Sequence, residues 1–207
     1  MKNSKIISDY LDELIPEPWC ELKFNTDYEL LIAIVLSAQT TDKRVNLVTS
    51  ELFNRYTNLQ ALKEAKTCEI EDILKSLGTF RKKSIYVKQI ATILVDDYNG
   101  KVPKDRKQLE KLPGVGRKTA SVFLCEYYDY PEFAVDTHVD RVSKRLGLVD
   151  INDNVLNIES KLRMIFKKEE WSKRHKQFVL FGRYYCKAIK PDCINCKLKN
   201  ICKKNKV

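Results

Sequence analysis

Residues 112–120 read LPGVGRKTA and form the most informative turn in this chain. Helical patterns run up to Leu112 and begin again at Arg117, so the segment joins two helices through a tight turn that contains two glycines. Glycine permits the sharp turn and leaves backbone N–H groups uncovered. Together with the positive end of the second helix, these groups form a site for an anion such as a phosphate. A turn that uses glycine only for geometry is the alternative, and the adjacent cations Arg117 and Lys118 favour the anion site.

The spacing of apolar residues is helical over almost the whole chain. A capping-box spacing at Thr26 and Glu29 precedes the apolar run 30–36, which predicts a buried helix there. Gly78 and the Asn-Gly pair at 99–100 stand where helices are expected to end. No strand-like alternation persists, so we predict an all-α fold. Further helices are expected over residues 6–14, 41–56, 68–77, 84–98, 105–112, 117–128, 138–146, 155–166 and 171–185.

The formal net charge is +10, and positive charge is concentrated near the C-terminus. Residues 183–207 contain eight Lys or Arg and one acidic residue, Asp192. Such an excess attracts polyanions, and nucleic acid is the first candidate. The longest apolar run, 30–36, is far shorter than a transmembrane helix, and no signal-peptide pattern follows Met1. We therefore expect a cytoplasmic protein without a membrane partner.

Four of the seven cysteines follow the pattern C-x6-C-x2-C-x5-C. Disulfides are rare in a reducing compartment, so this group predicts a metal site. Both tetrahedral zinc and an iron–sulfur cluster suit four thiolates. Lys187 and Lys190 lie in the first loop of the pattern, where metal ligation would hold them rigidly and available to phosphates. The candidate ligands are Cys186, Cys193, Cys196 and Cys202, and the thiols interpreted as inert are Cys20, Cys68 and Cys125.

Lys118 and Asp136 are the candidates for chemistry. Lys118 falls in the first turn of a predicted helix, where the positive end of the helix dipole disfavours an ammonium. A neutral amine is the form that attacks a sugar carbon. Asp136, in the segment VDTHV at 135–139, stands where aspartate is favoured as an N-cap, and a carboxylate there is also able to act as a base or to stabilise positive charge. A surface lysine and a plain cap are the alternatives, and His138 is interpreted as structural.

Three motifs in chain order resemble those of the endonuclease III family of bifunctional helix-hairpin-helix DNA glycosylases. They are LPGVGRKTA at 112–120, VDTHV at 135–139 and the four-cysteine pattern at 186–202. Each motif alone is common, but the combination is specific, and the resemblance covers about residues 26–202.

The resemblance implies two all-α helical lobes with a DNA-binding cleft between them. Residues 22–132 would form a helical bundle that carries the helix-hairpin-helix motif. Residues 1–21 and 133–207 would form a discontinuous helical lobe that carries the four-cysteine cluster loop at 186–202.

The resemblance also implies base excision repair of double-stranded DNA that contains damaged bases or abasic sites. Lys118 would displace the damaged base, expected to be an oxidised pyrimidine, through a Schiff base, and the abasic strand would then be cleaved by β-elimination. Asp136 matches the family's catalytic aspartate. The four cysteines match the ligands of a [4Fe-4S] cluster. The protein is expected to act as a monomer associated with DNA.

Gln39, in the segment LSAQTTD, matches the family's glutamine that fills the gap left by a flipped nucleotide. Thr79 stands where the family often has an apolar wedge, with Phe80 beside it. Because of this departure, we expect strand separation to use Phe80 or to depend more on Gln39. The other expected DNA contacts are Gly114, Val115, Gly116, Arg117, Lys187 and Lys190.

Two other functions fit part of the sequence. Monofunctional glycosylases of the same superfamily, such as mismatch-specific enzymes, generally lack a lysine at the position of Lys118. A non-catalytic DNA-binding module stabilised by metal fits the charge and the turn, but it does not explain why Lys118 and Asp136 occur together.

Overall fold

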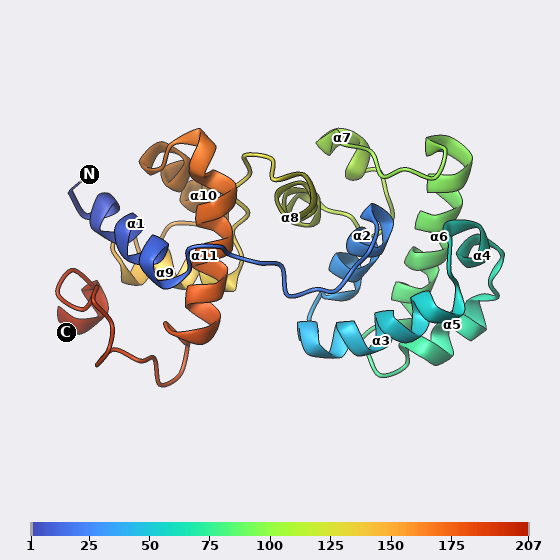
Figure 1. Cartoon of the computed structure of the whole chain (residues 1–207), viewed down its shortest axis with the longest axis horizontal. Helices are drawn as coiled ribbons and strands as arrows, with labels where there is room; N and C mark the ends of the chain where they lie inside the picture. The colour runs from blue at the N-terminus through green and yellow to red at the C-terminus, as the bar shows by residue number, and fades with distance from the viewer. Residues whose placement is uncertain (1, 207) are drawn as a thin grey trace. The chain divides into compact units, whose positions relative to one another are not determined.

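The computed structural model describes residues 2–206, and every regular element in that range is a helix, as the sequence predicts (Figure 1). None of the described helices is long and apolar enough to cross a membrane. The α-helices are α1 (Lys2–Leu14), α2 (Asp27–Leu36), α3 (Asp42–Arg55), α4 (Leu59–Glu64), α5 (Thr67–Leu74), α6 (Phe80–Tyr98), α7 (Arg106–Leu109), α8 (Arg117–Tyr128), α9 (Thr137–Arg145), α10 (Val155–Ile165) and α11 (Trp171–Tyr184), and the 3-10 helices are η1 (Lys168–Glu170) and η2 (Lys203–Lys206).

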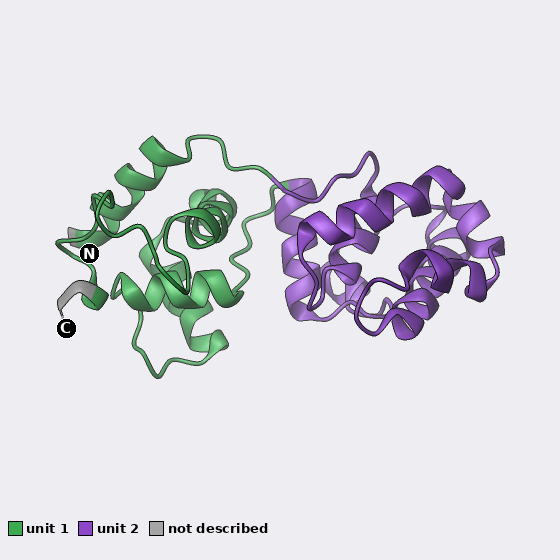
Figure 2. Ribbon diagram, turned by 90° about the horizontal axis from the view of Figure 1, so that it is seen from below, with its two compact units in different colours: residues 1–19, 129–207 green, residues 20–128 purple. Residues whose placement is uncertain are grey.

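The chain folds into two compact units, each with its own core (Figure 2). Unit 2 is the continuous segment 20–128. Unit 1 combines the N-terminal residues up to 19 with the residues from 129 onward. Unit 1 therefore contains α1 together with α9, α10 and α11, whereas unit 2 contains α2 to α8.

Unit 2 is built around α2, which is apolar on nearly all sides and buried from Tyr28 to Leu36. A helix of this kind must be covered all round by other elements. Its N-cap Thr26 accepts a hydrogen bond from the backbone N of Glu29 at 3.4 Å. The Glu29 carboxylate accepts from the backbone N of Asn25 at 2.6 Å, so the predicted capping box is closed one residue early. The surrounding core includes Val45, Leu52, Leu62, Ile70, Val87, Ile90, Leu109 and Phe123.

Unit 1 packs α1 against α11. Ile7 and Leu11 of α1 share a core with Phe178 of α11, and all three side chains are fully buried. Gln177 of α11 is also fully buried, and its Nε2 donates to the carbonyl oxygens of Leu11 at 3.1 Å and Ile15 at 2.8 Å. These bonds tie the C-terminal end of α1 to α11, and the bond to Ile15 pairs a carbonyl that lies beyond the end of the helix.

Three differences from the predicted helices have local causes. The sequence pattern does not reveal α4, because six residues are too few to show a periodicity. The expected end of the 68–77 helix at Gly78 is wrong: α5 ends at Leu74, and the left-handed residue is Thr79, with φ +55°. Helix α6 begins at Phe80 rather than Ser84, because the backbone N of Lys83 donates to the carbonyl of Thr79 at 3.1 Å and helical bonding therefore starts before the apolar pattern does.

Candidate functional site

The turn at 112–117 joins α7 to α8 as predicted. Gly114 has φ +75°, and a Cβ at this position would lie 2.6 Å from Cδ2 of Tyr86 and 3.1 Å from Cγ1 of Val35. Gly114 therefore allows the turn to approach α6 and α2 closely. A Cβ at Gly116 would meet open space, so a side chain there would fit but would cover the adjacent backbone.

Lys118 is the second residue of α8, and its side chain is exposed. The carbonyl of Gly116 accepts from the backbone N of Ala120 at 3.0 Å, so helical bonding begins directly after the turn. The side chain of Val115 is buried in the core, which leaves only its backbone for a ligand, whereas Arg117 is exposed. The start of α8 thus combines a positive helix end with two exposed cations.

Gln39 lies in the turn that joins α2 to α3, and its side chain is exposed. Its φ of +56° places the backbone in the left-handed region, which residues other than glycine adopt infrequently. The Nζ of Lys83 donates to the carbonyl oxygens of Leu36 and Ala38, both at 2.9 Å. The exposed Gln39 side chain therefore projects from a turn whose backbone is anchored to the interior of unit 2.

Thr79 and Phe80 lie at the start of α6 and differ in exposure. Thr79 is exposed, with its hydroxyl donating to the carbonyl of Gly78 at 2.7 Å. Phe80 is half-buried and packs against the core of unit 2, and the guanidinium of Arg81 lies 5.2 Å from the centre of its ring. Thr79, at the wedge position, is thus the more exposed of the two residues, and Phe80, expected to take part in strand separation, is the more firmly held.

These three segments meet around the contact between α2 and α6. The hairpin touches side chains of both helices at Gly114, and Lys83 of α6 bonds the turn that carries Gln39. The backbone N of Lys83 also donates to the carbonyl of Thr79 at 3.1 Å. Sequence reasoning missed Lys83, although its position four residues before the buried Val87 marks it as lying on the apolar face of α6.

Asp136 is the N-cap of α9 in unit 1, as its sequence position predicts. Its Oδ1 accepts from the backbone N of both His138 and Val139, at 2.8 Å each. Because both bonds share one oxygen, the second carboxylate oxygen is outside the cap. The side chain is half-buried. Capping and chemistry are therefore compatible at this residue, which belongs to a different unit from Lys118.

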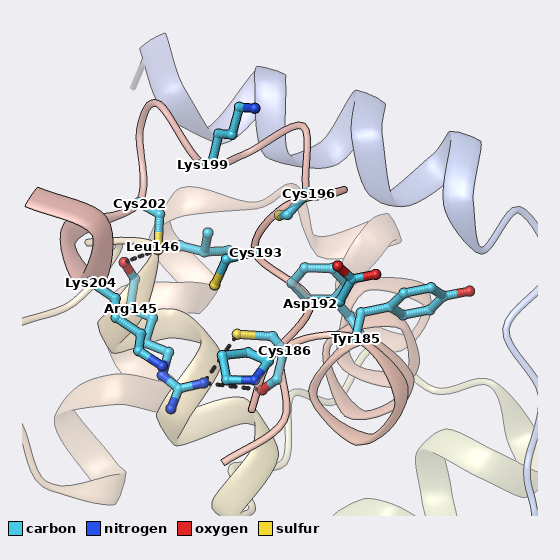
Figure 3. Close-up of a pocket in the computed structure, with 12 residues that line it drawn as sticks. Arg145, Leu146, Tyr185, Cys186, Asp192, Cys193, Cys196, Lys199, Cys202 and Lys204 are labelled. Carbon is cyan, nitrogen blue, oxygen red and sulfur yellow. Dashed lines mark hydrogen bonds between the residues drawn. The ribbon is translucent and has the colours of Figure 1, made fainter. Parts of the chain in front are cut away.

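The four candidate metal ligands line one pocket in unit 1 (Figure 3). Burial raises the pKa of the Cys196 thiol, and the other three thiols raise it further because neighbouring thiolates repel. In the range 2–206, no group of three or more His, Cys, Asp or Glu is arranged as a ready-made site for a metal ion. The structure therefore gathers four thiols at one pocket, and this donor set suits a thiophilic metal or an iron–sulfur group.

Arg145 of α9 ties the cysteine segment to its helix. Its Nη1 donates to Sγ of Cys186 at 3.4 Å, and its own carbonyl accepts from Sγ of Cys202 at 3.3 Å (Figure 3). The same Nη1 also donates to the carbonyl of Lys187 at 2.7 Å. Arg141, one turn earlier, donates through Nε to the carbonyl of Cys186 at 3.1 Å. The sequence analysis did not single out these arginines, although their i, i+4 spacing on one helix was an available signal.

Lys187 and Lys190, the predicted phosphate contacts of this segment, both have exposed side chains. Lys190 has φ +49°, a left-handed conformation. Since Arg145 binds the backbone at Lys187, this part of the loop is held by protein contacts as well as by whatever the thiols bind.

Comparison with protein families places residues 32–168 in the HhH-GPD superfamily of base excision DNA repair proteins. Among curated relatives, endonuclease III of Bacillus subtilis is 41% identical over 203 residues, which cover 98% of this chain and 93% of the relative. Endonuclease III of Escherichia coli K12 is 39% identical over 192 residues, which cover 93% of this chain and 90% of the relative.

Solved structures give the same relationship. A trapped covalent intermediate of endonuclease III with DNA matches with a TM-score of 0.92 and 44% identity, and the match covers 100% of this chain and 98% of that one. A thermostable thymine-DNA glycosylase matches with a TM-score of 0.83 at 21% identity, over 99% of this chain and 97% of that one, which shows a shared fold alone.

Proposed function

The chain belongs to the endonuclease III family within the HhH-GPD superfamily of base excision repair proteins, and on that premise we propose that Lys118 is its nucleophile and Asp136 its partner. The protein is a base excision repair glycosylase with lyase activity at abasic sites, and it binds DNA. Its expected lesions are oxidised pyrimidines in duplex DNA, on which it acts as a monomer.

The observation that carries the assignment of Lys118 is its placement at an exposed helix start directly after the glycine turn. The amine attacks the anomeric sugar carbon as the bond to the damaged base breaks. The resulting iminium allows β-elimination of the 3′ phosphate, which cleaves the strand. The turn and α8 offer backbone N–H groups and a positive helix end to a DNA phosphate, which positions the duplex without reading its sequence.

Asp136 serves this reaction through its charge. The cap uses one carboxylate oxygen, and the negative charge stabilises the positive charge that develops on the sugar as the base leaves. The same carboxylate is able to accept a proton from the attacking amine.

Gln39 and Thr79 contact the duplex around the target nucleotide and do not take part in the reaction at the sugar. The target nucleotide must leave the stack before its anomeric carbon is accessible, and a damaged base costs less free energy to extrude. Gln39 fills the gap from its exposed turn. Thr79 is the exposed tip of the second turn, and Phe80 supports it from the core.

The residues that line the pocket of unit 1 fit a [4Fe-4S] cluster, because four thiols from one short segment face a common space. Cys186, Cys193, Cys196 and Cys202 would hold this group. When bound, it would supply structural cross-linking of this segment rather than chemistry on the base. Lys187 and Lys190 then offer cations to the DNA backbone from a loop of defined shape.

Borohydride trapping tests the proposal. Reduction of the iminium should link the wild-type protein covalently to a duplex that contains a damaged base or an abasic site. Lys118→Ala should reduce trapping to below about one thousandth of wild type and should retain DNA binding. Lys101→Ala is the matched control, because it removes another exposed lysine of unit 2, and its trapping should be normal. Trapping that survives in Lys118→Ala contradicts the assignment.

A further inference from the structure

Lys83 is a buried cation in unit 2 to which neither the reaction nor the fold pattern assigns a role. Its side chain is 4% exposed. Nζ donates to the carbonyl oxygens of Leu36 and Ala38 at 2.9 Å and to Oγ1 of Thr40 at 3.2 Å. An ammonium has three donors, and here three acceptors meet them. Burying a charge is costly without such partners, so these contacts are needed to hold the ammonium in place.

The three acceptors enclose Gln39. Leu36 is the last residue of α2, so its carbonyl belongs to the negative end of that helix. Ala38 directly precedes Gln39 and Thr40 directly follows it. The ammonium therefore holds the backbone before Gln39 and the side chain of the residue after it, while the Gln39 side chain stays exposed.

The conformation of this turn needs such support. Gln39 has φ +56°, and a residue other than glycine keeps a left-handed conformation only where its surroundings impose it. Burial lowers the pKa of Lys83, which agrees with an ammonium that is desolvated inside the unit.

Lys83 also bonds the turn that carries Thr79, another predicted DNA contact. Its backbone N donates to the carbonyl of Thr79 at 3.1 Å, in the first turn of α6. One residue thus bonds the Thr79 turn through its backbone and the Gln39 turn through its side chain.

We propose that Lys83 is a positioning residue: its ammonium sets the distance between the two turns and presents Gln39 for insertion into the duplex. This inference rests on the proposed insertion role of Gln39. Lys83 touches no DNA and acts through the turn. Loss of its ammonium removes the donor that Leu36, Ala38 and Thr40 share and frees Gln39 to leave the left-handed conformation.

Lys83→Met tests the proposal, with Lys88→Met as its matched control. Lys88 lies on the same helix, and its Nζ donates to the carbonyl of Ala65, the C-cap of α4, at 2.7 Å. Both variants lose one positive charge and one bond between lysine and a helix C-terminus. Only Lys83→Met loses the contacts around Gln39. Any effect of the lost charge on DNA binding in general is common to both variants and does not contribute to the difference between them.

The first readout is amide hydrogen exchange of residues 37–41 in the protein without DNA. Exchange should accelerate about tenfold or more in Lys83→Met, in line with the loss of a charge-assisted network, and should stay at the wild-type rate in Lys88→Met. An unchanged exchange rate in a folded Lys83→Met protein overturns the proposal. If that variant does not fold, Thr40→Val removes one acceptor alone and should give a smaller acceleration in the same residues; no acceleration there also overturns it.

The second readout is the preference for a duplex with a tetrahydrofuran abasic-site analogue over an undamaged duplex. Lys83→Met should lower this preference roughly tenfold. Gln39→Ala should lower it by a similar factor, and the double variant should lose little more, because both changes remove one function. If the double variant instead loses the product of the two single-variant factors, Lys83 and Gln39 act independently and the positioning role is overturned. Gln39→Ala that keeps the full preference refutes the insertion role of Gln39 itself, while the exchange data still decide whether Lys83 holds the turn.

Discussion

The two units hold their irregular segments in different ways. In unit 2, the exposed turns at Gln39 and Thr79 are fixed by the protein alone, through Lys83 and the close approach at Gly114. In unit 1, the cysteine segment is held at its start by Arg141 and Arg145 and otherwise converges on four thiols. The turns of unit 2 are thus organised before any ligand binds, whereas we expect unit 1 to depend on the proposed cluster to complete part of its structure.

The largest effect should come from removing one of the thiols. Cys196→Ala should lose iron and lower the melting temperature of unit 1 by more than about 10 °C, because metal-binding free energy is also folding free energy. Hydrogen exchange should localise the loss to α9, α11 and the cysteine segment and should leave α2 and α6 protected. The measurements are iron content, visible absorbance and exchange.

Cys68→Ala is the matched control for this change, since it removes an exposed thiol of unit 2. It should keep its iron and its melting temperature. Wild-type protein that is free of iron yet fully stable and active would refute the cluster, and destabilisation that spreads equally to unit 2 would refute the contrast between the units.

The second-largest effect is expected at Asp136, where one substitution distinguishes a role as a helix cap from a role in the reaction. Asp136→Asn keeps an oxygen acceptor for His138 and Val139 but removes the negative charge. We expect kcat to fall about 10²–10³-fold, as for loss of a group that stabilises transition-state charge, with a stability change within about 1 kcal/mol. Single-turnover rates and thermal unfolding measure the two quantities separately.

The same substitution in unit 2 provides the control. Asp105 caps α7 through the backbone N of Gln108 at 3.1 Å, so Asp105→Asn changes an equivalent cap. Its turnover should remain within about twofold of wild type, which is the range expected for a change that affects a cap alone. If Asp136→Asn loses stability and keeps its turnover, Asp136 is a cap and nothing more.

Sequence patterns predict the helices best where the partners of each residue are local. The bounds of α8 agree with its pattern residue for residue, because the glycine turn directly precedes the helix and the apolar spacing lies within it. Asp136 is predicted as an N-cap for the same reason. Local spacing carries information about local hydrogen bonds, so these features needed no knowledge of tertiary structure.

The sequence did not allow us to predict contacts between residues that lie far apart along the chain. Lys83 bonds a carbonyl 47 residues away, and Arg145 bonds carbonyls 41 to 43 residues away. Periodicity indicates which face of a helix is buried, but it does not identify which loop meets that face. The motifs for Lys118 and the four cysteines name candidate residues, and their roles stay predictions that the proposed experiments test.

The smallest effect should come from the ion-pair network that docks α1 in unit 1. Asp12 accepts from Nη2 of the buried Arg174 at 2.8 Å, forms an ion pair with Lys173 at 2.7 Å and accepts from Nε2 of Gln177 at 3.1 Å. Burial by itself would raise the pKa of Asp12, but the hydrogen bonds from Arg174, Lys173 and Gln177 outweigh it. The pKa of Asp12 therefore lies well below its usual range.

The sign of the pH dependence follows from that direction. The folded state favours the carboxylate, so the network contributes its full stability above the unfolded pKa of about 3.9. The contribution is lost as pH falls below that value and through the folded pKa. At pH 7, Asp12→Asn should reduce the free energy of unfolding by about 1–2 kcal/mol, a value discounted because Asp12 is partly exposed. The gap between wild type and variant should narrow progressively below about pH 4.

Urea unfolding at pH 7, 4 and 3 measures this gap. Asp9→Asn is the matched control on the same helix, because Asp9 pairs with Lys5 in an exposed i, i+4 arrangement. An exposed pair contributes little, so Asp9→Asn should leave the stability of unit 1 nearly unchanged at each pH. A gap for Asp12→Asn that is as wide at pH 3 as at pH 7 would mean that the carboxylate charge does not hold α1 against α11. The docking of α1 would then depend on the apolar contacts of Ile7 and Leu11 and on Gln177, with Asp12 acting only as a neutral acceptor.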